Sequence, residues 1–130
     1  MIKIVDTHQH LWDLERLKLP WLDNVLALKK EHLPAHYLKA SEGTGIKRTI
    51  YMEVDAHADH KQKEIEDMTM LCKSEDEIMQ GMVISANPGD SGFSKFLEIN
   101  SENHYIKGIR QVLHTPEQPV KYCLSTEFMQ

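Results

Sequence analysis

Near its start the chain has a short strand-like run that ends in two histidines, Ile2-Lys3-Ile4-Val5-Asp6-Thr7-His8-Gln9-His10. Its β-branched beginning predicts a strand over 2–10. Side chains alternate between the faces of a strand, so Asp6, His8 and His10 are expected on one face. Two such imidazoles at a strand end can hold one metal ion, and neutral imidazole suits zinc and neighbouring divalent metals. The alternative is a pair of surface histidines, but Asp6 before them and Leu11-Trp12-Asp13 after them favour a site.

Three further segments share the features of buried strands, because each is short, apolar and rich in β-branched residues. They span 48–54, 79–86 and 105–113 and recur at intervals of roughly 30 residues, the size of one βα unit. Helices are predicted between the strands: one from Pro34 to the glycines at 43 and 45, one over 59–72 with its Lys and Glu residues opposite the apolar face, and one over 93–99. This alternation predicts an α/β fold with a parallel sheet covered by helices.

Composition narrows the functional classes. The chain has 130 residues, 41% hydrophobic and 27% charged, which is enough to bury the core of one domain. A net charge of −5, without a cluster of basic residues, argues against a nucleic-acid partner. Cys72 and Cys123 form no CxxC pattern, so we expect free thiols in a reducing compartment. Neither a signal peptide nor a membrane-length apolar run is found, which predicts a cytoplasmic protein without membrane contact.

The first run also carries a family resemblance. Val-Asp-Thr-His-Gln-His-Leu-Trp-Asp at 5–13 resembles the opening of the amidohydrolase-related family, in the branch of sugar-acid lactonases such as L-fuconolactonase and L-rhamnonolactonase, and of 2-pyrone-4,6-dicarboxylate lactonase. Pro20-Trp21-Leu22 resembles the same branch. Ile-Lys-Gly-Ile-Arg-Gln-Val-Leu-His at 106–114 is similar to its fourth strand. The resemblance covers essentially the whole chain, in order.

This resemblance implies a metal-type (β/α)₈ barrel that hydrolyses a lactone of a sugar acid or a similar carboxylated ring. His8 and His10 fall on the family's first-strand pair, which binds a divalent metal, zinc first, or contacts substrate where a member works without metal. A full barrel takes about 250 residues, so residues 1–130 are expected to form one partial domain, the N-terminal half of the barrel. The family's later histidines and its eighth-strand aspartate have no counterpart here, so no complete catalytic set is expected in this chain.

Other polar side chains are expected near the strand ends. Arg110 falls on the family's fourth-strand arginine, and an inward arginine would bind an anionic small molecule through a bidentate contact. Pairing with a surface carboxylate is the alternative for Arg110. Glu53 is predicted to face the pocket and contact substrate, whereas Asp55 and His57 are more simply loop residues. His114 has a weaker case for pocket contact.

Two alternatives to a lactone hydrolase remain open. The first is a non-catalytic half-barrel that dimerises or needs a complementary half, because its outer strands would offer unpaired parallel edges. The second is a small metal-binding module that uses His8, His10 and a ligand from the second strand.

Overall fold

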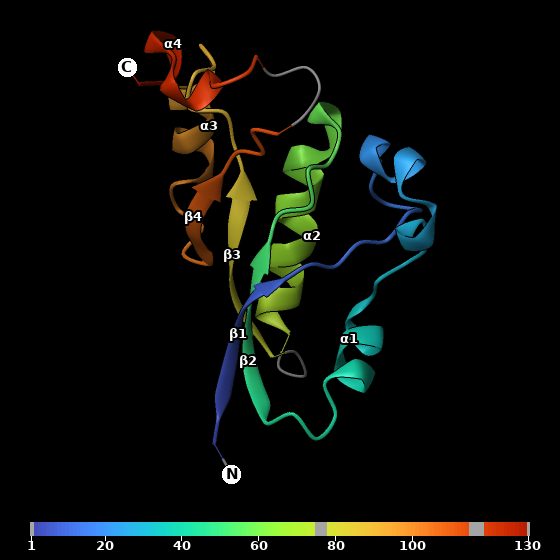
Figure 1. The fold of residues 1–130 in the computed structure, drawn as a ribbon. Helices are drawn as coiled ribbons and strands as arrows, with labels where there is room; N and C mark the ends of the chain where they lie inside the picture. Colours follow the sequence, from blue (N-terminus) through green and yellow to red (C-terminus); the bar gives the residue numbers. More distant parts are fainter. Residues whose placement is uncertain (1, 75–77, 115–118, 130) are drawn as a thin grey trace.

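The chain folds around one sheet of four parallel strands, which a computed structural model describes over residues 2–74, 78–114 and 119–129. The strands lie in sequence order, each hydrogen-bonded to the next, and their C-terminal ends point the same way (Figure 1). They are β1 (Ile4–Gln9), β2 (Ile46–Met52), β3 (Met79–Ser85) and β4 (Ile106–Arg110). The predicted α/β class and all four predicted strands are confirmed, with strand ends that differ from the predicted ones by up to three residues.

Helices connect the strands as the spacing predicted. They are α1 (Pro34–Ala40), α2 (Lys61–Lys73), α3 (Phe93–Asn100) and a short α4 (Thr126–Met129), with 3₁₀ helices η1 (Pro20–Asn24), η2 (Leu26–Leu28), η3 (Ala58–His60) and η4 (Tyr122–Leu124). Pro34 begins α1 because its fixed φ is already helical. Gly43 and Gly45 then adopt φ of 75° and 86°, a left-handed backbone that turns the chain into β2. None of the described helices is long and apolar enough to cross a bilayer.

The core lies between the sheet and α2, which packs along β3 (Figure 1). Its centre is formed by Tyr51 of β2 and Met82 of β3, paired in register and 1% and 0% exposed. Ile65 and Met68 of α2 are buried with them in one apolar cluster. Removing this apolar surface from water is the main favourable contribution to folding.

The connection from β1 to α1 is an ordered loop that folds back on itself. Trp12 and His32 exchange two backbone hydrogen bonds of 3.0 and 2.9 Å, which form an isolated antiparallel bridge. The indole of Trp12 donates to the Lys30 carbonyl at 2.7 Å. Leu17, Leu19 and Leu22 from the same loop are buried in the core. The loop is therefore packed against the domain.

A buried carboxylate joins three elements beneath the strand ends. Glu64 of α2 is 3% exposed, so the expectation that every Glu of this helix lies opposite its buried face is wrong. Glu64 Oε1 accepts hydrogen bonds from the Tyr51 hydroxyl at 2.8 Å and the Val54 amide at 2.9 Å. The same hydroxyl lies 3.3 Å from the carbonyl of Leu11, just after β1. Glu64 is buried because these donors replace its water.

Replacing Glu64 should show how much this network contributes. Glu64→Leu leaves the Val54 amide without its acceptor and the Tyr51 hydroxyl with only the more distant Leu11 carbonyl. We therefore expect a loss of about 2 kcal/mol in unfolding free energy, measured by urea denaturation. Glu64→Gln retains an acceptor oxygen and should cost far less. An equal loss in the two variants would contradict the role of the hydrogen bonds.

Comparison of the parent with Glu64→Gln should also reveal a pH dependence of stability. Burial raises the pKa of Glu64 above its ordinary value of 4.5. The folded state therefore binds its proton more tightly than the unfolded state, and stability decreases as the pH rises from 4.5 through the raised pKa. Relative to Glu64→Gln, the parent should lose stability over that window.

Candidate active site

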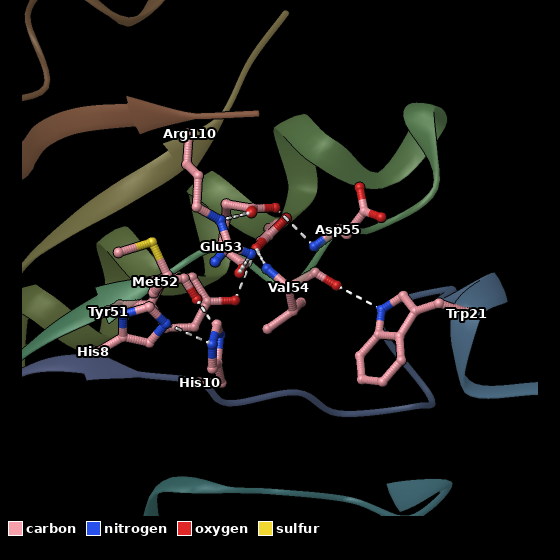
Figure 2. Close-up of polar contacts among 10 residues, drawn as sticks. His8, His10, Trp21, Tyr51, Met52, Glu53, Val54, Asp55 and Arg110 are labelled. Atoms are coloured by element: carbon pink, nitrogen blue, oxygen red, sulfur yellow. Dashed lines mark hydrogen bonds and ion pairs between the residues drawn. The ribbon is translucent and has the colours of Figure 1, made fainter. Parts of the chain in front are cut away.

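The two histidine rings meet at the end of β1. Their Nε2 atoms lie 3.1 Å apart, with ring centroids separated by 4.9 Å and ring planes 76° apart (Figure 2). His10 Nδ1 lies 2.9 Å from the carbonyl oxygen of Met52. A carbonyl can only accept, so the proton of a neutral His10 sits on Nδ1 and the lone pair on Nε2 faces His8. The two rings therefore converge on one point, as their spacing predicted.

This convergence fits one metal ion. Two imidazole nitrogens at about 2.0–2.1 Å from a tetrahedral zinc lie about 3.3 Å apart, close to the 3.1 Å between the Nε2 atoms. The Met52 carbonyl is the type of outer partner that fixes the orientation of a ligating imidazole. Burial lowers the pKa of His10, which favours the neutral form that a metal needs. His8 and His10 fit a metal as two of its ligands.

Within residues 2–74, 78–114 and 119–129, no third protein ligand lies beside this pair. Among the described residues, no group of three or more His, Cys, Asp or Glu side chains could hold a metal ion. The hypothesis of a three-ligand module with a donor from the second strand is therefore not supported in the described part of the chain.

Asp6 does not lie with the histidines, so its predicted position is wrong. Its carboxylate accepts hydrogen bonds from the Tyr37 hydroxyl of α1 at 2.6 Å and from the His8 backbone amide at 3.0 Å. The Tyr37 hydrogen bond is the main cause that lowers the pKa of Asp6. The physical reason is an irregular register between Asp6 and Gln9, which interrupts the simple alternation of faces. Asp6 thus joins α1 to β1 and holds the backbone at His8.

Glu53 and Arg110 form an ion pair beside the histidines. The Glu53 side chain is 1% exposed and that of Arg110 33%. Arg110 Nε donates to Glu53 Oε1, and Nη2 donates to the Glu53 backbone carbonyl at 3.3 Å (Figure 2). The other carboxylate oxygen accepts the Asp55 amide at 2.7 Å. Glu53 is held by Arg110 and the backbone, while part of the Arg110 side chain stays exposed to solvent.

A cavity of about 690 Å³ opens next to these groups, at the C-terminal ends of β1, β2 and β4. Arg110, His10 and His114 contribute to its wall, so the structure brings three of the five predicted site residues to one cavity. Its complete lining is His10, Trp12, Trp21, Asn24, Val25, Leu28, His32, Val54, Asp55, Arg110, Val112 and His114.

Two tryptophans form an aromatic side of the cavity. Trp12 and Trp21 meet edge to face, with ring centroids 5.7 Å apart. The Trp21 indole donates to the Val54 carbonyl at 2.8 Å, which fixes the ring against the end of β2 (Figure 2). The cavity therefore combines an aromatic surface with a cationic group, Arg110.

Asp55 is the lining residue that the sequence did not reveal as special. It adopts φ of 51°, a left-handed backbone that is uncommon for residues with a side chain. Burial is the first cause that raises its pKa, and the nearby Glu53 charge adds to it. A backbone angle leaves no mark in a sequence unless glycine occupies the position, so only the structure could identify it.

Comparisons with known proteins show a likeness to a solved structure. No family model matches the chain, and no curated protein matches it. Among solved structures, Amidohydrolase 2 from Bifidobacterium longum subsp. infantis aligns over 99% of this chain with a TM-score of 0.65 and 24% identity. The likeness shows the fold. The aligned region is 46% of that protein, so this chain spans about half its length, and its four strands match part of a (β/α)₈ barrel.

The contribution of the Glu53–Arg110 ion pair to stability can be measured directly. Arg110→Met leaves a buried Glu53 charge without its counter-ion, which should lower the unfolding free energy by about 3 kcal/mol, measured by urea denaturation. The double change Glu53→Gln with Arg110→Met removes the charge as well and should recover most of that loss. Arg48→Met, an exposed arginine on β2, is the matched control and should stay within about 0.5 kcal/mol of the parent. A double variant as unstable as Arg110→Met would contradict this account.

Proposed function

We propose that this chain belongs to the amidohydrolase-related type and contributes the metal and substrate groups for hydrolysis of a lactone or a related ester or amide. The observation that carries the proposal is the convergence of His8 and His10 Nε2 at 3.1 Å, at the C-terminal end of a parallel strand. Sites of parallel α/β proteins form at this edge of the sheet. The fold likeness to an amidohydrolase structure agrees with the proposal.

The roles of the residues follow from their contacts. His8 and His10 would hold a divalent metal, zinc first, and such a metal polarises a carbonyl or lowers the pKa of bound water. The Met52 carbonyl accepts a hydrogen bond from His10 Nδ1–H, which keeps the lone pair on Nε2 available. Arg110 has five N–H donors; Nε and Nη2 are engaged by Glu53. The others can bind a substrate carboxylate or carbonyl.

The cavity lining favours a ring-shaped, carboxylated substrate. Trp12 and Trp21 offer a flat apolar surface, and Arg110 offers a cation in the same cavity. His114 lies at the exposed end of this wall and can add a further hydrogen bond. Contact of substrate with Glu53 stays a prediction, because its carboxylate is enclosed by Arg110 and Asp55.

Zinc binding tests the metal site directly. In equilibrium dialysis at a fixed concentration of free zinc, the parent should hold about one ion per chain on the two imidazoles, whose spacing fits a tetrahedral zinc. The double change His8→Ala with His10→Ala should abolish that binding, read by atomic emission. His104→Ala removes an exposed histidine far along the chain and is the control. A lactonase assay with sugar lactones, with and without zinc, then tests the reaction. Equal zinc in the parent and the double variant would refute the site.

A second role is supported by the edges of the sheet. In the described part of the chain, β1 and β4 are the outer strands and each pairs with one neighbour. Val5 on β1 is 54% exposed and Ile109 on β4 is 40% exposed. Unpaired strand edges with apolar side chains attract other strands. We propose that the chain associates through these edges, with another copy or with a complementary half of a barrel.

Sedimentation equilibrium tests this association. The parent should form dimers or larger species at micromolar concentration, and Val5→Lys should shift the distribution toward monomer because a charge on an edge strand opposes pairing. Val120→Lys changes a 93% exposed residue outside the sheet and should leave the distribution unchanged. A parent that stays monomeric over the whole concentration range would exclude the proposal.

A further inference from the structure

A second cavity, of about 290 Å³, is formed by the loop after β1, the residues that begin α1 and one side of α2. Trp12 and His32 line this cavity and also the first cavity, which contains His10 and Arg110. The two spaces are therefore neighbours with one common wall. An apolar cavity of about 150 Å³ can hold benzene, so the second cavity has room for a substituted single ring.

The lining of the second cavity is mostly apolar. Eight of its twelve described lining residues are apolar, and Leu11, Leu17 and Met68 among them are between 3% and 6% exposed. Water in an apolar space finds few hydrogen-bond partners, so such a space favours an apolar guest. Transfer of an apolar molecule from water into the second cavity is therefore favourable.

The charged side chains around the second cavity compensate one another. Arg16 donates to the Asp67 carboxylate from Nε at 2.9 Å and also from Nη2. Lys63 Nζ lies 3.5 Å from the same carboxylate. The hydrogen bond to Asp67 is the first cause that raises the pKa of Arg16, and the charge of Asp13 adds to it. Two basic and two acidic groups thus balance, and an ionic ligand would lose its hydration without a counter-charge of its own in the described lining.

Aromatic rings and thioethers form the part of the lining that favours an aromatic guest. The rings of Trp12 and His32 are 4.3 Å apart between centroids, with planes tilted by 49°. Burial lowers the pKa of His32, which keeps its ring neutral. Met68 and Met70 line the same cavity, and sulfur makes favourable contacts with aromatic rings. Ring–ring contacts add to the gain from burial alone.

We propose that the second cavity binds a small uncharged aromatic molecule, which differs from the substrate of the first cavity. The molecule lies among Trp12, His32 and the thioether of Met68. Because Trp12 and His32 also line the first cavity, the bound molecule contacts the common wall. The site requires neither a metal nor hydrolysis, so it is independent of the proposed function.

Titration with three soluble probes tests the class of ligand. Phenol is an uncharged aromatic ring near neutral pH, cyclohexanol has the same hydroxyl on an aliphatic ring, and benzoate has a charged group on the aromatic ring. Phenol should cause a saturable shift of the Trp12 indole N–H signal in nuclear magnetic resonance, assigned through Trp21→Phe. Cyclohexanol should bind several-fold more weakly because it lacks the aromatic contacts. Benzoate should bind at least about tenfold more weakly because its charge must be desolvated.

Two matched substitutions locate the site. Of the two cavities, Leu33 lines only the second and Leu28 only the first. Leu33→Trp fills the second cavity with an indole and should weaken phenol binding at least about tenfold, because close-packed side chains leave no space for the guest. Leu28→Trp makes the same change in the first cavity and should leave the phenol affinity unchanged. If circular dichroism shows that Leu33→Trp is unfolded, Leu71→Trp, which fills the second cavity from α2, takes its place.

The proposed site would be refuted by the absence of a saturable shift with phenol, by cyclohexanol or benzoate binding as tightly as phenol, or by phenol affinity that survives in the folded filled variant. Loss of phenol binding in Leu28→Trp, with retention in Leu33→Trp, would assign the ring to the first cavity instead. A chain that binds phenol as expected yet holds no zinc would retain the site and lose only the proposed reaction.

Discussion

A carboxylate without exposed surface needs a counter-charge or hydrogen bonds in place of water, and Glu53 obtains both at the centre of this structure. Arg110 reaches it from β4, across the end of β3, while the Asp55 amide approaches from the following residues. The pair therefore ties the ends of strands that are not neighbours in the sheet. The position of Arg110 in the first cavity and the sharp turn at Asp55 both depend on it.

The histidine pair is also positioned by hydrogen bonds to groups beneath the strand ends. His10 is oriented by a backbone carbonyl of β2, and Tyr51 of β2 is held by Glu64 of α2. The first contact joins a side chain of the cavity wall to the backbone behind it, and the second fixes the core residue that precedes Met52. The geometry at the strand ends is consequently set by the packing of the sheet on α2.

Sequence patterns were sufficient for the architecture because strands and helices here follow their ordinary periodicities. β-branched runs mark all four strands, and Pro34 with Gly43 and Gly45 brackets α1. The convergence of His8 and His10 also followed from alternation along a strand. The position of Asp6 did not follow from this alternation. The register shift after Asp6 depends on pairing with β2, which a single segment does not encode. Glu64 was misplaced since its burial requires donors from distant residues, and Asp55 because a strained φ is a property of the folded backbone.

The bridge between Trp12 and His32 has an evolutionary consequence. It closes residues 12–32 into a loop whose two ends are fixed to each other, independently of what lies between them. Insertions or replacements at the tip, over 24–28, would reshape the side of the cavity that Asn24, Val25 and Leu28 form without displacing any strand. Substrate range can therefore diverge quickly in descendants of this sequence while the sheet and its histidines are inherited unchanged.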